Sequence, residues 1–176
     1  MTKSIKKPVS VSIIGGSGYT GAEVIRLLSK HPYFNLFQVV ANRNVGKKIQ
    51  TVFPHLRHLD LPDFISFEEM NFEDVELIFC ALPHATSQEI IVKIPQGKKI
   101  IDLSADFKLE RLEEYEKWYG KKHIAPALQE KAVYGLTEIY KKKIKEGSLI
   151  ACTGCNSAAT LYPLIPLLSE GVINDT

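Results

Sequence analysis

The sequence predicts an α/β fold of the Rossmann type, in which a doubly wound and mostly parallel sheet carries helices on its faces. Short apolar or β-branched runs alternate along the chain with helical patterns, as they do in sheets built from strand–helix–strand units. A glycine-rich turn directly follows the first run and opens the first helical stretch. The run at 75–82 is apolar except for Glu76, which is typical of a strand buried on both faces.

Length and composition describe an ordinary globular protein. The chain has 176 residues, of which 45% are hydrophobic and 24% are charged, and its net charge is +2. That length predicts one domain, or one domain and part of a second. Lysines cluster at 3–7 and at 141–145 without an aromatic platform, so we expect solvated surfaces there and no nucleic-acid partner.

The sequence lacks the signals of a membrane or secreted protein. No apolar run reaches the length of a membrane span, and the basic N-terminus has no apolar signal core. We therefore expect no membrane partner and a cytoplasmic location, where the three cysteines would stay reduced.

The first strand, 9–14, runs into a glycine-rich loop and then into a helical pattern over 22–30. The loop fits the dinucleotide fingerprint G-x-G-x-x-G, whose glycines let the backbone turn tightly and approach a pyrophosphate at the helix N-terminus. A plain glycine turn is the alternative. The candidate cofactor-binding residues of this loop are Gly15, Gly16, Ser17, Gly18, Tyr19, Thr20 and Gly21.

The end of the second strand, 34–41, indicates which dinucleotide is bound. NAD-binding proteins carry an acidic residue there for the ribose hydroxyls. Here the strand is followed by Asn42 and Arg43, and no acidic residue occurs between Glu23 and Asp60. A guanidinium suits a 2′-phosphate, which it can pair with bidentately, so we expect NADP as the cofactor. The alternative for Arg43 is a solvated loop cation.

Residues 45–72 have an irregular, loop-like pattern with two prolines. His55 and His58 form a His-x-x-His pair, but no third ligand is near in the sequence, so we expect no metal site.

The middle of the chain repeats the strand–helix pattern. The strand at 75–82 should place Leu82, Pro83 and His84 near the cofactor, because ligands bind outside the carboxyl ends of such strands. Thr86 or Ser87 is a candidate N-cap for a helix over 88–94. A further strand at 98–103 places Ser104 among the candidate cofactor contacts.

From 107 to 147 the segments are shorter and more charged. A helix is predicted at 112–118, a loop surrounds Pro126, and a lysine-rich helix ends at Lys145. Cys80 lies inside an apolar strand and is expected in the core.

The last strand, 148–151, leads through a Thr-Gly turn into a helix that opens at Cys155. A thiol at a helix N-terminus faces unpaired N–H groups and the positive end of the helix dipole, which favour the thiolate. Cys155 is therefore the candidate nucleophile. Pro163 and Pro166 predict a bend or restart of this helix near Tyr162.

Together these motifs resemble the N-acetyl-gamma-glutamyl-phosphate reductases, the arginine-biosynthesis members of the semialdehyde dehydrogenase superfamily. The resemblance covers nearly the whole chain. The segments at 102–108 and 133–138 are more specific to this family than the glycine loop is. The segments are GGSGYTGAE (15–23), DLSADFK (102–108), YEKWYG (115–120), VYGLTE (133–138), ALPH (81–84) and Gly-Cys (154–155).

The resemblance implies an NADPH-dependent reduction of N-acetyl-gamma-glutamyl phosphate to the semialdehyde. In that chemistry the cysteine displaces phosphate from an acyl phosphate to form a thioester, which then accepts a hydride. It also implies a homo-oligomer. Substrate contacts are expected from Asp106, Lys108 and Asn156, although Lys108 stands where arginine is common and lacks its bidentate fork.

The surroundings of the nucleophile depart from the common pattern of the family. The Cys155-Asn156 form looks more like a subgroup that acts on glutamyl or aminoadipyl phosphate attached to an amino-group carrier protein. It also loosely resembles aspartate-semialdehyde dehydrogenase. Cys152 is either a packed small residue or the partner of Cys155 in a reversible disulfide.

The family's acid/base histidine lies downstream of the cysteine, whereas no histidine follows Cys155 in this chain. We therefore expect an N-terminal portion, with an NADP-binding domain at 1–150 and, at 151–176, the nucleophile turn and first helix of a truncated α+β catalytic domain. Such an isolated chain should bind NADP weakly and lack turnover. A non-catalytic nucleotide-binding domain is the alternative from another functional class.

Overall fold

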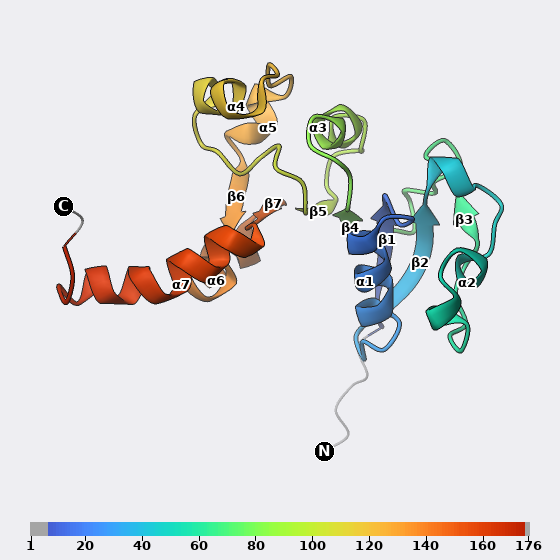
Figure 1. The fold of residues 1–176 in the computed structure, drawn as a ribbon. Coiled ribbons are helices and arrows are strands. Elements are labelled where there is room, and N and C mark those ends of the chain that lie inside the picture. Colours follow the sequence, from blue (N-terminus) through green and yellow to red (C-terminus); the bar gives the residue numbers. More distant parts are fainter. Residues whose placement is uncertain (1–6, 175–176) are drawn as a thin grey trace.

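A computed structural model describes residues 7–174, so most of the first lysine cluster lies outside the described part. Seven strands form one sheet in the order β3-β2-β1-β4-β5-β7-β6, and every neighbouring pair is parallel (Figure 1). This confirms the predicted Rossmann-type fold. The strands are β1 (Val9–Ile14), β2 (Phe34–Val40), β3 (Phe64–Ile65), β4 (Leu77–Cys80), β5 (Lys99–Asp102), β6 (Ala132–Gly135) and β7 (Leu149–Cys152).

Helices connect consecutive strands, except between β3 and β4, where residues 66–76 form an irregular crossover. In residues 7–174, no helix is long and apolar enough to cross a membrane. The helices are α1 (Tyr19–Leu28), α2 (Ile49–Val52), α3 (Thr86–Ile91), α4 (Leu112–Tyr119), α5 (Pro126–Gln129), α6 (Thr137–Glu146) and α7 (Cys155–Ser169), with short 3-10 turns η1 (Asn42–Asn44) and η2 (Pro54–Leu56).

The strand order reverses beside β1. From β1 the chain moves outward to β2 and β3 on one side, then returns to β4 and β5 on the other. Such a switch point opens a crevice at the carboxyl ends of the two flanking strands, which is where open α/β sheets bind ligands.

The core lies on both faces of the sheet. Ile13 and Val39 pack in one apolar cluster together with Ile25 of α1, whereas their chain neighbours Ile14 and Val40 pack in a second cluster with Ile91 of α3. Successive side chains of a strand point to opposite faces, so a strand covered on both sides has apolar residues at neighbouring positions.

Residues 45–72 contain more regular structure than the sequence predicts. They include α2, η2 and the edge strand β3, which pairs with the end of β2 through Val39–Phe64 and Val40–Ile65. A strand of two residues is too short to show an alternating pattern, which is why it is not visible in the sequence.

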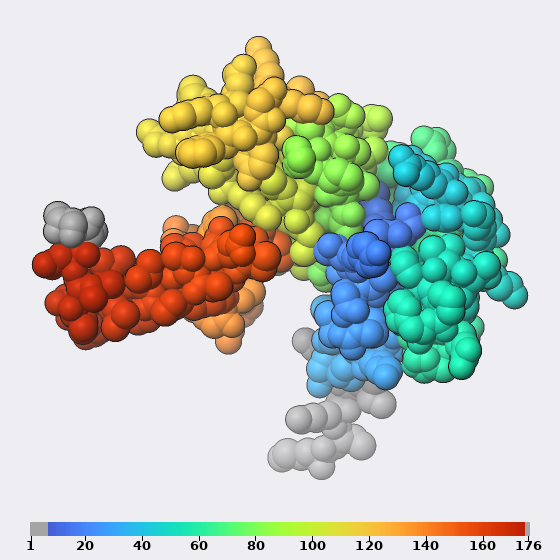
Figure 2. Space-filling model, in the orientation of Figure 1, coloured from blue at the N-terminus to red at the C-terminus, as the bar shows by residue number. Residues whose placement is uncertain are grey.

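Helix α7 runs from Cys155 to Ser169 as one helix, so of the two outcomes expected near Tyr162, a bend or a restart, the restart is wrong. Pro163 and Pro166 lie inside it and each removes one backbone donor. The helix extends away from the sheet, and none of its side chains is buried (Figures 1 and 2).

Candidate active site

The strand–turn–helix at the nucleophile forms as the sequence predicts. Strand β7 ends at Cys152, Thr153 and Gly154 make the turn, and Cys155 is the first residue of α7. Gly154 is the N-cap and provides no side-chain cap. The first-turn N–H groups therefore have no side-chain partner at the cap, and Cys155 is exposed beside them.

The three cysteines, all free thiols, have different surroundings. Cys80 is fully buried in β4, and burial together with the charge of Asp102 raises its pKa well above the ordinary value. Burial also raises the pKa of the half-buried Cys152, although the nearby Lys108 cation opposes this. Cys155 is thus the one of the three that is open to a substrate.

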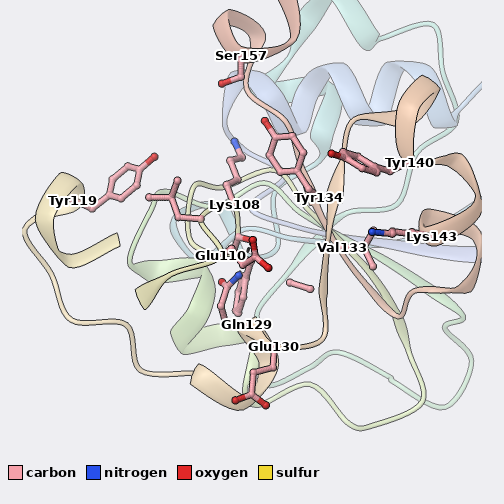
Figure 3. A pocket seen from close by; sticks show the side chains of 13 residues that line it. Lys108, Glu110, Tyr119, Gln129, Glu130, Val133, Tyr134, Tyr140, Lys143 and Ser157 are labelled. Atoms are coloured by element: carbon pink, nitrogen blue, oxygen red, sulfur yellow. Dashed lines mark hydrogen bonds between the residues drawn. The ribbon is translucent and has the colours of Figure 1, made fainter. Parts of the chain in front are cut away.

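Lys108 brings a positive charge to the nucleophile turn. Its Nζ lies 4.0 Å from the position that a Cβ on Gly154 would occupy. Its side chain lines a cavity of about 790 Å³ together with Tyr134 and Ser157, and Figure 3 shows all three at the same end of that cavity. Asn156 is exposed next to Cys155, with its Oδ1 3.9 Å from the Cys155 Sγ.

The glycine loop has the geometry of a dinucleotide cradle. Gly15 has φ +89°, and a Cβ there would lie 2.4 Å from the carbonyl oxygen of Ala81. A Cβ on Gly21 would lie 2.6 Å from Gly15 O, so α1 packs tightly on the loop. By contrast, a Cβ on Gly18 would meet only one atom, at 3.9 Å. The backbone of Gly18 is therefore open at the N-terminus of α1, which is what a bound pyrophosphate requires in dinucleotide-binding folds.

Helix α1 begins at Tyr19, earlier than predicted, so Tyr19 and Thr20 form its first turn and both are exposed. Ser17 is half-buried in the turn before it. The loop after β4 lies against this turn, because the Gly15 Cβ position is 3.0 Å from Leu82 Cδ2. The structure therefore brings Leu82 to the glycine loop. Pro83 and His84, which follow it, are exposed, and the His84 ring lies 5.7 Å from the Tyr119 ring.

Asn42 and Arg43 form the first part of η1, directly after β2, and both are exposed. Gly16 N and Gly15 N each donate a 3.0 Å hydrogen bond to Val40 O, which holds the glycine loop beside the end of β2. Arg43 therefore follows the end of the strand at which dinucleotide-binding folds contact the ribose.

Ser104 and Asp106 belong to a buried network. Asp102 accepts hydrogen bonds from the hydroxyls of Ser87 and Ser104, both at 2.6 Å, and burial raises its pKa despite these bonds. The Asp106 carboxylate accepts from Ala85 N at 2.6 Å and from Gln88 N at 2.9 Å. It is fully buried, so its oxygens bond to the protein and not to the cavity.

The predicted N-cap of α3 is consequently wrong. Neither Thr86 nor Ser87 caps this helix; Ala85 is the N-cap, with φ +65°. The Ser87 hydroxyl bonds Asp102 instead, and the carboxylate of Asp106, distant in sequence, accepts the N–H groups at the start of α3. Sequence patterns near α3 contain no signal for a capping group that arrives from another segment.

Three further polar residues surround Asp106. The Tyr115 hydroxyl donates to its carboxylate at 2.8 Å, and Gln88 Nε2 donates to that hydroxyl at 3.1 Å. His123 Nδ1 accepts from Ala125 N, so its Nε2–H donates to Asp106 O at 2.9 Å, and burial lowers the His123 pKa. The polar Gln88 inside a short helix is the one local signal of a buried hydrogen-bond network here.

His55 and His58 are both exposed. Across residues 7–174, no group of three or more His, Cys, Asp or Glu side chains is arranged to hold a metal ion.

Comparison with known proteins agrees with this geometry. Residues 10–147 match the model of the family described as semialdehyde dehydrogenase, NAD binding domain. The N-acetyl-gamma-glutamyl-phosphate reductase of Rhodobacter capsulatus is 51% identical over 164 residues, which are 93% of this chain and 48% of that protein. The probable chloroplastic enzyme of that name from Arabidopsis thaliana is 46% identical over 96% of this chain and 42% of its own length.

A solved structure shows the same fold. The aspartate semialdehyde dehydrogenase of Candida albicans, solved with NADP, has a TM-score of 0.65 and 18% identity, over 93% of this chain and 48% of that one. This chain spans about half the length of the curated relatives it matches. It belongs to the semialdehyde dehydrogenase family, and residues 10–147 form the nicotinamide-dinucleotide-binding domain of that family.

Proposed function

We propose that this chain is the cofactor-binding and nucleophile-bearing part of an N-acetyl-gamma-glutamyl-phosphate reductase that uses NADPH. The observation that carries the proposal is the exposed Cys155 at the start of α7, directly after the glycine that the Lys108 cation approaches. Relatives that are about half identical over nearly all of this chain are named for this substrate, which supports the proposal. The activity of a whole enzyme is part of the proposal, because the chain covers about half of those relatives.

In the first step the Cys155 thiolate attacks the acyl carbon of the acyl phosphate. A carbon–sulfur bond forms, and the bond from that carbon to the phosphate oxygen breaks, with phosphate leaving with the electron pair. Lys108 is close enough to the turn to neutralise charge on the departing phosphate. A lysine does this as a point charge and without the fork of an arginine.

The second step converts the thioester to the aldehyde. When bound, the reduced nicotinamide supplies a hydride to the thioester carbon. The residues that would hold this cofactor are those of the glycine loop and of the 82–84 segment, whose Leu82 lies against that loop. The carbon–sulfur bond then breaks, which returns the Cys155 thiolate and releases the semialdehyde.

NADPH is proposed over NADH because of the end of β2. Asn42 and Arg43 stand there, and no carboxylate competes for the ribose. A 2′-phosphate would pair with the exposed guanidinium of Arg43, whereas NADH offers it no anion at that position.

The substrate contacts proposed from this chain are Lys108 and Asn156. Asp106 has no exposed surface, so it cannot contact a substrate directly. We propose instead that it positions the loop after β4 through its hydrogen bond with Ala85 N. Because Asn156 follows the nucleophile, an acyl phosphate carried by an amino-group carrier protein is the second candidate substrate.

The test uses a protein that contains this chain and measures phosphate-dependent reduction of NADP⁺. N-acetylglutamate semialdehyde should be oxidised much faster than aspartate semialdehyde or a carrier-linked glutamate semialdehyde. Cys155→Ser should abolish turnover, whereas Cys152→Ser should retain it. Faster oxidation of either competing aldehyde would contradict the proposed substrate and indicate that aldehyde instead. The isolated chain is expected to show no turnover.

Iodoacetamide labelling distinguishes an enzyme from a non-catalytic nucleotide-binding domain. In the folded chain at neutral pH, Cys155 should react several-fold faster than it does in the urea-unfolded chain. The unfolded chain is a better reference than Cys80, which is buried and would react slowly for that reason alone. Equal rates in the folded and unfolded chain would favour the binding domain.

A further inference from the structure

We propose that Tyr134 is a positioning residue for the nucleophile: through the Thr153 hydroxyl, it fixes the turn that presents Cys155. The inference rests on the proposed function, in which Cys155 attacks the substrate. Tyr134 is half-buried on β6 and lines the cavity that also contains Lys108 and Ser157 (Figure 3).

The end of β6 lies directly beside the nucleophile turn. Strands β6 and β7 are parallel neighbours, with Tyr134 opposite Ala151 and Gly135 opposite Cys152. A Cβ on Gly135 would lie 2.9 Å from both Ala151 O and Cys152 Cα. The glycine therefore allows the backbone of β6 to approach the last residues of β7 closely, which brings the Tyr134 side chain to the turn.

A directed chain of hydroxyl groups connects Tyr134 to the start of α7. The Tyr134 hydroxyl is 2.7 Å from Thr153 Oγ1, and the Thr153 hydroxyl donates to Gly154 O at 3.4 Å. Since Thr153 has a single hydroxyl proton, both bonds form together only if Tyr134 is the donor. Gly154 O also accepts Ala158 N at 2.9 Å, the bond that opens the helix.

Helix α7 depends on such polar contacts because it has no buried side chain. A second tyrosine contact involves Tyr162, which lies on α7 about two turns after Cys155. The Tyr162 hydroxyl bonds the Glu138 carboxylate and lies 3.3 Å from Thr137 Oγ1, both at the start of α6. The β6–α6 segment thus holds the beginning of α7 at two points, and Tyr134 is the one next to the nucleophile.

Losing the Tyr134 hydroxyl should leave the turn less restricted. The Cys155 sulfur would then spend less time in line with the first-turn N–H groups that favour the thiolate. We expect Tyr134→Phe to slow iodoacetamide labelling of Cys155 at neutral pH about fivefold, the effect of one typical hydrogen bond. The pH profile of the rate should differ from that of the wild type, which a loss of stability alone would not cause.

The experiment measures the pH profile of labelling in the full chain, resolved for Cys155 by mass spectrometry. Tyr140→Phe is the matched control, because Tyr140 lines the same cavity but makes no hydrogen bond to Thr153 in the described residues. Thr153→Val should reproduce the effect of Tyr134→Phe, and the double variant should be no slower than either. Thr153→Ser keeps the hydroxyl and should retain the wild-type profile.

Each result of these measurements either supports or overturns the role proposed for Tyr134. A wild-type profile in Tyr134→Phe, or additive effects in the double variant, overturns the inference. If Tyr134→Phe does not fold, the pair Thr153→Val and Thr153→Ser decides, and equal profiles in that pair overturn it. If Cys155 of the wild-type chain reacts no faster in the folded than in the unfolded chain, the proposed function is contradicted. If Cys155 reacts fast but equally in the wild type and in Tyr134→Phe, only the role of Tyr134 is contradicted.

Discussion

The Tyr115 hydroxyl donates a 2.8 Å hydrogen bond to the Asp106 carboxylate, and both side chains are almost completely buried. Burial, together with the hydrogen bond to this carboxylate and its charge, raises the pKa of Tyr115 strongly, so the phenol stays a donor. The same carboxylate accepts the N–H of Ala85, which has positive φ. Asp106 thereby ties α4 to the loop that follows β4, at the cofactor crevice.

Replacing Asp106 by Asn should destabilise the chain. The carboxylate accepts three hydrogen bonds, from Ala85 N, Gln88 N and the Tyr115 hydroxyl, and an amide nitrogen cannot accept any. At least one buried donor loses its partner, so we expect the free energy of unfolding in urea to fall by about 2 kcal/mol. Glu110→Gln, at an exposed acidic residue, is the control and should change it little. Equal effects would contradict the role assigned to Asp106.

The buried His123 should make stability depend on pH. Burial lowers its pKa in the folded state, so as the pH falls below about 6.5 the unfolded chain binds a proton that the folded chain does not. Stability should therefore be full above that pH and decline below it. Urea unfolding midpoints measured across this pH range should fall less steeply with falling pH in His123→Gln than in the wild type. In the exposed His58→Gln they should fall as in the wild type. If His123→Gln declines as steeply as the wild type, another group is responsible.

Gly15→Ala should be far more damaging than Gly46→Ala. Both glycines have positive φ, +89° and +74°, so an alanine at either pays the left-handed backbone cost of about 1–2 kcal/mol. Only at Gly15 would the added Cβ meet backbone, 2.4 Å from Ala81 O, whereas at Gly46 nothing lies within 4 Å. The difference between their unfolding free energies measures the clash. Similar values for the two variants would contradict the close approach of the glycine loop and β4.

Arg43 should decide between the two nicotinamide dinucleotides. Arg43→Ser removes the guanidinium proposed to pair with the 2′-phosphate, so we expect the dissociation constant for NADPH to rise about tenfold. The constant for NADH should change little. Titrations followed by nicotinamide fluorescence check this, with the exposed Arg57→Ser as the control for loss of a positive charge. Parallel losses for both cofactors would show that Arg43 does not contact the 2′-phosphate.

Much of the fold was predictable because its signals are local. The β-branched run 9–14, the glycine spacing after it and the apolar run that contains β4 each reflect the chemistry of neighbouring residues. The strand–turn–helix at Cys155 was predictable for the same reason. The edge strand β3 was not, since a strand of two residues contains no period.

The sequence by itself determined the α/β alternation, the glycine loop and a cysteine at a helix start, because backbone preference and apolar period act over a few residues. Only the tertiary structure decided which polar groups meet. Asp106 accepts the N–H groups of α3 from 18 and 21 residues away, and Tyr134 reaches Thr153 across 19. Such hydrogen bonds form only after the parallel strands are aligned, since register, and not sequence distance, brings their ends together.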